Sequence, residues 1–298
     1  MIIERHTKDH LRLKTPAKIN LFLEVLNKRG DGYHDINSLF QAVSLFDEID
    51  FRHLPGRPEC DLELESRWPL TISADNLICR AYQLLKERFN LVDGLSVRLK
   101  KNIPVAAGLG GGSSDAAATL LATSILCNQK LDYPALAELG AEIGSDIPFF
   151  FSGGQALVGG RGEQVTPTEI PTDFWVLLVT PDLAISTAAS YAAVSLVLTL
   201  NREPLSFERC GTAPELVEFL GPAGNDFEKV QFKAYPELVS IRDQLLQSGA
   251  LLARLSGSGP TVYGVFMDEP TDQSRRLSGH NFWQVTIARP VLLAARLP

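Results

Sequence analysis

The residues best suited to chemistry form a glycine-rich run between Pro104 and Ser114. Four of the five residues from 108 to 112 are glycine, the fifth is Leu109, and an alanine-rich stretch follows directly. Glycines let the backbone turn its N–H groups toward an anion, and a helix N-terminus adds about half a positive charge. The pattern therefore predicts a phosphate-binding loop in front of a helix, in preference to a merely flexible loop.

Three familiar classes of phosphate-binding protein do not fit this run. A Walker A loop ends in Gly-Lys-Ser/Thr, whereas Gly112 is followed by Ser113. The HRD and DFG segments of protein kinases are absent from the sequence. A dinucleotide-binding fold requires an acidic residue about 20 residues further on, after a strand. Asp132 has about that spacing, but Pro134 begins a helix there, so a dinucleotide oxidoreductase is disfavoured.

Other candidate residues are polar side chains next to predicted elements. Lys18 and Asn20 lie on the polar side of an alternating strand, which by itself indicates a solvated face. Asp146 lies between a predicted helix end and Pro148, where a helix N-cap is the simplest role. Tyr33-His34 follows a Gly-Asp-Gly turn. An exposed aromatic side chain with a hydrogen-bonding neighbour is suited to bind a planar base. The alternative that stays open is that Tyr33 packs into the core.

Several ordered segments make the sequence resemble the GHMP kinases, which include galactose, homoserine, mevalonate and phosphomevalonate kinases. Residues 16–20 resemble the first family motif, 104–117 the second and 256–261 the third. The match is closest to the branch that phosphorylates a CDP-linked methylerythritol in the non-mevalonate isoprenoid pathway. Four segments carry that match: Ala17-Lys-Ile-Asn-Leu21, Gly30-Asp-Gly-Tyr-His34, Gly108-Leu-Gly-Gly-Gly-Ser-Ser-Asp115 and Gly144-Ser-Asp-Ile-Pro-Phe149.

The resemblance implies ATP-dependent phosphorylation of the substrate's 2-hydroxyl, giving the 2-phosphate and ADP. It implies that Lys18 and Asp146 are catalytic, with Asp146 as the base and Lys18 anchoring the phosphate. Mg²⁺ is expected with ATP, and its ligands stay unknown. The implied ATP-binding residues are Pro104, Val105, Ala106, Ala107, Gly108, Leu109, Gly110, Gly111, Gly112, Ser113 and Ser114. The implied substrate-binding residues are Asn20, Tyr33, His34, Thr187 and Tyr191, with the cytosine held between the two tyrosines.

The resemblance also implies a fold of the α+β class with two domains. Residues 1–165 would form an N-terminal domain similar to ribosomal protein S5 domain 2, and residues 166–298 a ferredoxin-like C-terminal domain contributing to the substrate site. The third motif would support the transfer site. A mevalonate-type kinase is the nearest alternative, against which Tyr33-His34 argues. A non-catalytic ATP-binding regulator is another, against which the presence of Lys18 and Asp146 argues.

The elements that must position these residues follow from periodicity and capping. The predicted linker is 167–171. We expect helices at 77–89, 114–127, 132–144, 188–200 and 272–278, and one or two helices within 228–247. We expect strands at 15–25, 36–51, 61–65, 95–101, 149–151, 155–158, 175–180, 251–256, 261–267 and 282–287.

Composition narrows the range of partners. The net charge is −7 and the chain has no basic tail, which argues against nucleic acid as a partner. Residues 183–201 carry no charge, but serines and threonines interrupt them, so a membrane span is disfavoured. The four cysteines show no disulfide or zinc spacing. We expect a cytoplasmic enzyme with a small-molecule substrate, as a monomer or weak homodimer.

Overall fold

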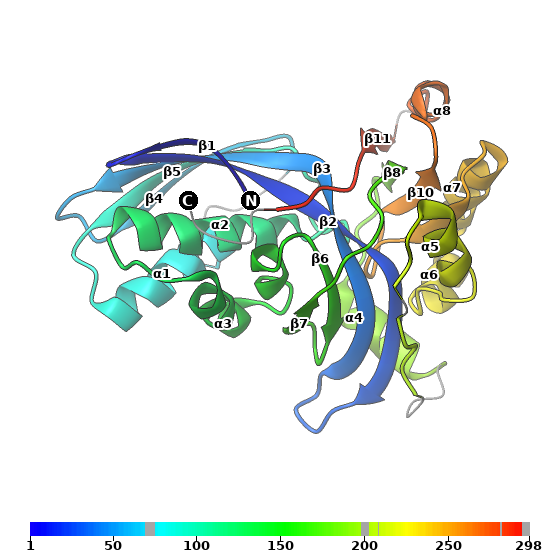
Figure 1. Ribbon diagram of the computed structural model, residues 1–298, viewed down its shortest axis with the longest axis horizontal. Coiled ribbons are helices and arrows are strands. Elements are labelled where there is room, and N and C mark those ends of the chain that lie inside the picture. Colours follow the sequence, from blue (N-terminus) through cyan, green and yellow to red (C-terminus); the bar gives the residue numbers. More distant parts are fainter. Residues whose placement is uncertain (69–74, 198–202, 208, 281, 294–298) are drawn as a thin grey trace.

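Two β-sheets organise the chain in a computed structural model that describes residues 1–68, 75–197, 203–207, 209–280 and 282–293. The first sheet has seven strands and the second has four among the described residues. Figure 1 shows helices α1, α2 and α3 along one face of the first sheet, and α5 to α8 gathered around the second sheet. Helices and strands are mixed and most strand pairs are antiparallel, so the α+β class is confirmed.

The first sheet is built around two very long strands, β2 and β3, which pair as a hairpin. Its order is β1-β2-β3-β5-β4; in addition, β6 pairs with β3 and β7 pairs with β6. The β4–β5 pair is parallel, and α1 is the crossover helix that connects these two strands. The strands are β1 (Ile2–Thr7), β2 (His10–Lys28), β3 (His34–Leu54), β4 (Cys60–Ser66), β5 (Gly94–Lys101), β6 (Gln155–Gly159) and β7 (Gln164–Pro167).

Three helices and one 3₁₀ turn cover this sheet and bury its apolar face. The central helix is rich in alanine and nearly all of its residues are buried, so it packs close to the sheet. Asn76 and Asp132 cap two of the helices through their side-chain oxygens. The helical elements are α1 (Leu77–Phe89), α2 (Gly111–Leu126), α3 (Tyr133–Ile143) and the 3₁₀ turn η1 (Pro148–Phe151).

The second sheet is antiparallel, in the order β11-β8-β10-β9. A core of Leu177, Val179, Leu238 and Ile241 lies between this sheet and its helices. A further core, which includes Leu109, joins the second sheet to β2 and β3. The strands are β8 (Trp175–Pro181), β9 (Leu252–Leu255), β10 (Val262–Phe266) and β11 (Trp283–Ala288). The helices are α4 (Thr187–Ser195), α5 (Ala213–Leu220), α6 (Glu228–Ala234), α7 (Pro236–Gln247) and α8 (Thr271–Leu277).

Most predicted elements are present, and one is wrong. The strand predicted at 149–151 is the 3₁₀ turn η1, because Pro148 sets its start and the core takes up all three phenylalanine rings that follow. The helix predicted from residue 114 begins three residues earlier, at Gly111. The end of the helix predicted at 188–200 lies outside the described residues. Strands β1 and β7 and helix α5 were not predicted.

The chain crosses between its two halves more than once. The predicted division at residue 165 falls within β7, which pairs with β6 in the first sheet, and it stays a prediction. Near its end the chain returns to the first sheet, where Val291 N–H donates to the Ala42 carbonyl at 2.9 Å. Within the described residues, no helix combines the length and apolar character that crossing a bilayer requires.

Candidate active site

A cavity of about 970 Å³ opens beside the glycine-rich loop. Lys18 and Asn20 of β2, Asp146, and Thr187 and Tyr191 of α4 all line it, so it unites residues far apart in the sequence. The loop residues on its wall are Pro104, Val105, Ala106, Ala107, Gly108, Gly110, Gly111, Gly112 and Ser113. Most of the predicted site residues therefore share one space.

Four predicted site residues are not on the cavity wall. Leu109 is buried in the core, and its side chain anchors the loop while its carbonyl accepts a hydrogen bond from Lys18 N–H at 2.8 Å. Ser114 is fully buried, and its hydroxyl has no hydrogen-bond partner among the described residues. Tyr33 and His34 lie at the end of the β2–β3 hairpin. Their roles stay predictions.

The glycine-rich loop brings the first residues of α2 to the cavity wall. Gly110 is the N-cap of α2, and the first intrahelical bond runs from Ser114 N–H to the Gly110 carbonyl at 2.9 Å. The N–H groups of Gly111, Gly112 and Ser113 therefore have no partner within the helix. No acidic residue lies in the first turn, so its partial positive charge is not neutralised locally. The serines are not the helix cap, which leaves these N–H groups available to an anion.

Two close approaches require glycine in this loop. A Cβ on Gly110, where φ is +68°, would lie 2.9 Å from Lys18 Cγ. A Cβ on Gly108, where φ is +76°, would lie 2.0 Å from the Ser256 carbonyl oxygen. Ser256 Oγ in turn donates to the Gly108 carbonyl at 2.9 Å. The turn at 256–261 thus packs directly against the loop, and the supporting role predicted for it stays a prediction.

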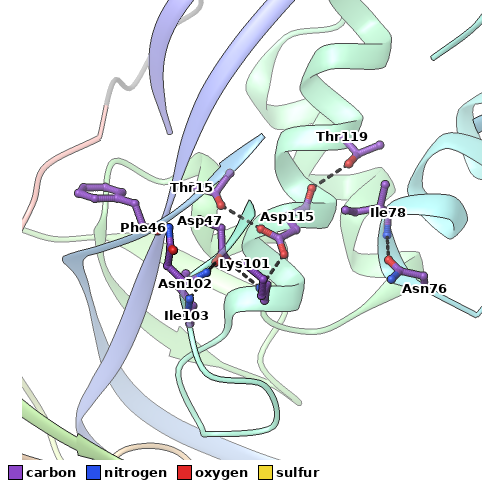
Figure 2. Close-up of polar contacts among 10 residues, drawn as sticks. All are labelled: Thr15, Phe46, Asp47, Asn76, Ile78, Lys101, Asn102, Ile103, Asp115 and Thr119. Carbon is purple, nitrogen blue, oxygen red and sulfur yellow. Dashed lines mark hydrogen bonds and ion pairs between the residues drawn. The ribbon is translucent and has the colours of Figure 1, made fainter. Parts of the chain in front are cut away.

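A buried cluster of charged residues holds the two ends of the loop together (Figure 2). Lys101 Nζ donates to Asp47 Oδ2 at 2.5 Å and to Asp115 Oδ2 at 2.7 Å. Asp47 Oδ1 also accepts the backbone N–H groups of Asn102 and Ile103, at 2.6 and 2.8 Å. Because Asp115 belongs to α2 and residues 102–103 precede the loop, one ammonium group links the start of the loop to its end. Sequence reasoning did not single out Lys101 or Asp47.

Burial sets the protonation behaviour of this cluster. Loss of water around Asp115, with the negative charge of Asp47 nearby, raises the pKa of Asp115 to about 7, against the opposing effect of Lys101. Burial alone would lower the pKa of Lys101, but the two carboxylates outweigh it and raise that pKa above its ordinary value. Lys101 is therefore held as a cation.

A second buried lysine, Lys18, faces the open cavity. Its Nζ donates to Asn20 Oδ1 at 2.7 Å, lies 3.5 Å from Asp146 Oδ2, and lies 4.5 Å from the centre of the Phe40 ring. Lys18 is 4% exposed and Asn20 is fully buried, so the solvated face suggested by alternation is wrong. Ser38 Oγ accepts from Asn20 Nδ2 at 3.0 Å and fixes the amide.

The Lys18–Asp146 pair has the properties needed for proton and phosphoryl transfer. Burial lowers the pKa of Lys18 from its ordinary value, and the nearby carboxylate of Asp146 partly restores it. Asp146 does not cap a helix, because the following turn η1 has Ile147 at its N-cap position and no side-chain cap. The side chain of Asp146 is one-third exposed, so a ligand in the cavity can reach it. A hydroxyl group placed here would meet both a cation and a proton acceptor.

The aromatic residues at the hairpin tip are arranged differently from a simple pair of facing tyrosines. The His34 and Tyr191 rings stack, with their centres 5.3 Å apart, and His34 Nε2 lies 2.6 Å from Ser195 Oγ. Tyr33 is 53% exposed, and its ring centre lies 5.2 Å from the guanidinium of Arg161. The predicted grip on a base from two sides stays a prediction.

Arg161 lines the cavity and is a residue that sequence reasoning missed. Its signal in the sequence is a charged residue between two glycines, shortly after the strand predicted at 155–158. Thr187 is one of the predicted substrate-binding residues. Its hydroxyl oxygen lies 3.0 Å from Ser258 Oγ, and both residues line the cavity. Among the residues that the structure describes, no group of three histidine, cysteine or acidic side chains is arranged to hold a metal ion.

The loop, the helix N-terminus and the lysine–aspartate pair define a phosphotransferase that acts on a small molecule. Comparison with known proteins agrees. Residues 76–154 match the family described as GHMP kinases N terminal domain, and residues 212–278 match GHMP kinases C terminal.

Three similar proteins carry the comparison further. The chain is 41% identical over 255 residues to the 4-diphosphocytidyl-2-C-methyl-D-erythritol kinase of Geobacillus thermodenitrificans, covering 86% of this chain and 88% of that one. It is 42% identical over 262 residues to the protein of the same name from Caldanaerobacter subterraneus, covering 87% and 88%. A crystal structure of 4-(cytidine 5'-diphospho)-2C-methyl-D-erythritol kinase superposes with a TM-score of 0.73 and 30% identity, covering 94% and 99%.

The chain belongs to the GHMP kinase family, in the branch of the 4-diphosphocytidyl-2-C-methyl-D-erythritol kinases. The two-domain GHMP kinase fold expected from the sequence is confirmed. Membership of a kinase family implies that ATP is the phosphoryl donor.

Proposed function

We propose that this enzyme transfers the γ-phosphoryl group of ATP to the 2-hydroxyl of 4-diphosphocytidyl-2-C-methyl-D-erythritol, giving the 2-phosphate and ADP. The observation that carries this proposal is the shared cavity. One wall is a loop with unpaired N–H groups at a helix N-terminus, and the Lys18–Asp146 pair lies on the same cavity. The identity of about 40% to enzymes of that name supports the choice of substrate.

The mechanism follows from what each group can do at this distance. The N–H groups of Gly111, Gly112 and Ser113 bind the phosphates of ATP. Asp146 accepts the proton of the acceptor hydroxyl, and the Lys18 ammonium stabilises the negative charge on the transferred group. Asn20 keeps the ammonium in place through its 2.7 Å hydrogen bond. Transfer is direct and in line, because among the described residues no histidine, and no obvious nucleophile beyond Asp146, lines this cavity.

Mg²⁺ is proposed to enter with ATP as its complex. The cavity offers oxygen atoms of the kind that this ion takes, in the carboxylates of Asp75 and Asp146 and the hydroxyl of Ser113. Mg²⁺ keeps several waters and binds mainly to substrate phosphates, so few protein ligands are needed. When bound, it would neutralise charge on the phosphates.

The deciding experiment compares acceptors. The enzyme is mixed with MgATP and either the CDP-linked alcohol, free methylerythritol or mevalonate, and ADP release is followed. We expect rapid turnover with the CDP-linked alcohol and very slow turnover with the other two. Equal turnover of free methylerythritol would show that the enzyme does not require the cytidyl group, and it would favour a kinase for another small alcohol. ATP binding without turnover of any acceptor would favour a non-catalytic regulator.

A further inference from the structure

Arg161 reaches the active-site cavity from the turn between β6 and β7. Its side chain is 34% exposed, and it lines the same cavity as Lys18 and Asp146. Its guanidinium carbon lies 5.2 Å from the centre of the exposed Tyr33 ring. The guanidinium thus borders both the cavity and the aromatic tip of the hairpin.

The turn that carries Arg161 is built tightly against the catalytic segment. Gly160 and Gly162 flank it with positive φ values of +61° and +121°. A Cβ on Gly162 would lie 3.0 Å from Ser145 Cβ and 3.6 Å from Asp146 Oδ1. The Arg161 N–H donates to the carboxylate of Glu163 at 2.8 Å. The turn that carries Arg161 therefore packs closely against the segment of Ser145 and Asp146.

Within the described residues, much of the hydrogen-bonding capacity of the guanidinium is unused. Nη2 donates to the Ala141 carbonyl at 3.3 Å, and Nε lies 3.8 Å from the Glu163 carboxylate, too far for a hydrogen bond. A guanidinium has five N–H donors in a planar fork that matches phosphate oxygens. By contrast, Arg88 makes two hydrogen bonds, at 2.9 and 3.0 Å, to the carboxylate of Glu142.

We propose that Arg161 binds the diphosphate group of the CDP-linked substrate, an inference that rests on the proposed function. That substrate joins a base to an alcohol through a diphosphate, and the alcohol must reach Lys18 and Asp146. The groups that contact the guanidinium belong to the β2–β3 hairpin, α3 and its own turn, whereas the ATP phosphates have a separate cradle between β5 and α2. Arg161 therefore recognises the diphosphate that joins the base of the substrate to its alcohol.

The test measures binding without turnover. Isothermal titration of CDP and of cytidine is carried out with the ATP site filled by a non-hydrolysable ATP analogue. Arg161→Ala should raise the Kd of CDP about tenfold to a hundredfold, the usual scale for a charge-assisted hydrogen bond, and leave cytidine within about twofold. Arg161→Lys should recover only part of the loss, because it keeps the charge but not the fork.

A matched control removes an arginine elsewhere. Arg275 on α8 is 76% exposed and pairs with Asp272 at 3.2 Å, so Arg275→Ala should leave both affinities unchanged. Equal weakening of CDP and cytidine by Arg161→Ala would overturn the proposal, because it would indicate general damage to the pocket. Unchanged CDP affinity with weaker binding of the ATP analogue would also overturn it, because the guanidinium would then serve the γ-phosphate.

The outcome separates this inference from the proposed function. If the native enzyme phosphorylates the CDP-linked alcohol and Arg161→Ala leaves CDP affinity within about twofold, only the role of Arg161 is wrong. If the native enzyme fails to phosphorylate that alcohol, the proposed function itself is wrong.

Discussion

Replacing Asp146 with asparagine removes a charge beside the Lys18 ammonium and keeps the side-chain size. Two effects are expected. Turnover should fall about 100-fold or more, because the proton acceptor is lost. The pKa of Lys18 should fall further below its ordinary value, because burial lowers it and Asp146 is the group that raises it.

The second effect can be sized from the distance. At 3.5 Å, two unit charges interact by about 5 kcal/mol at an effective dielectric constant of about 20, and by about 1 kcal/mol at about 80. Asp146 is 33% exposed, so the lower half of that range applies. Losing this attraction lowers the pKa of Lys18 further, because burial then acts without the opposing carboxylate. Because the ammonium exists below its pKa, the alkaline limb of the pH–rate profile should move to lower pH.

The assay is kcat against pH, between about pH 6 and 10, from ADP release with both substrates saturating. Asp272→Asn on α8, which also removes one carboxylate charge, serves as the matched control and should behave as the native enzyme. Thermal unfolding checks that Asp146→Asn is folded. Near-native turnover would remove Asp146 from the chemistry. An alkaline limb that stays in place or moves upward would refute the electrostatic coupling to Lys18.

Three further variants test other parts of the site. Gly111→Val should weaken ATP binding about tenfold or more, because a Cβ there meets buried side chains at 2.8 and 2.9 Å. Separate titrations should show unchanged binding of the cytidyl substrate, and equal loss of both ligands would indicate that the loop is only structural. Tyr33→Ala should raise the substrate KM about 5- to 100-fold and lower kcat less than kcat/KM, while the KM for ATP stays unchanged. An unaltered substrate KM would exclude stacking of Tyr33 on the cytosine. Asp115 has a raised pKa of about 7 in the folded chain, so its stabilising contribution is complete below about pH 4 and lost as the pH rises through about 7. Asp115→Asn should therefore flatten the fall in unfolding free energy across that window in urea titrations, and an unchanged slope would contradict this assignment.

Local sequence signals predicted the elements that carry their own pattern. The helix at 77–89 has its cap at Asn76 and regular apolar spacing, and α1 has the predicted bounds. The loop before α2 was predicted because glycines and a helix start are local features. Helix α5 had a usable signal that was overlooked: Thr212 Oγ1 accepts from Glu215 N–H, and the Glu215 carboxylate accepts from Gly211 N–H.

Features that depend on distant residues were missed or misjudged. Alternation placed Lys18 and Asn20 on a polar strand face, but that face is covered by the glycine-rich loop, whose Leu109 carbonyl bonds to Lys18 N–H. The phenylalanines after Pro148 resembled a strand because an apolar run has no period of its own. Strand β7 is only four residues long and is defined by its pairing with β6, which no local pattern reveals.

The two buried lysines show why one belongs to the framework and the other to the chemistry. Lys101 also lines the cavity, but its Nζ is bonded to two carboxylates within 2.7 Å, which raise its pKa and compensate its charge. Lys18 has one carboxylate at 3.5 Å, an amide oxygen and an aromatic face, and its pKa is lowered. Its charge is thus only partly compensated at the wall of an open cavity. Asp146 compensates the Lys18 charge only in part, and a negatively charged phosphoryl group would compensate the rest. Lys18 therefore stabilises the transferred group most strongly when negative charge develops on it.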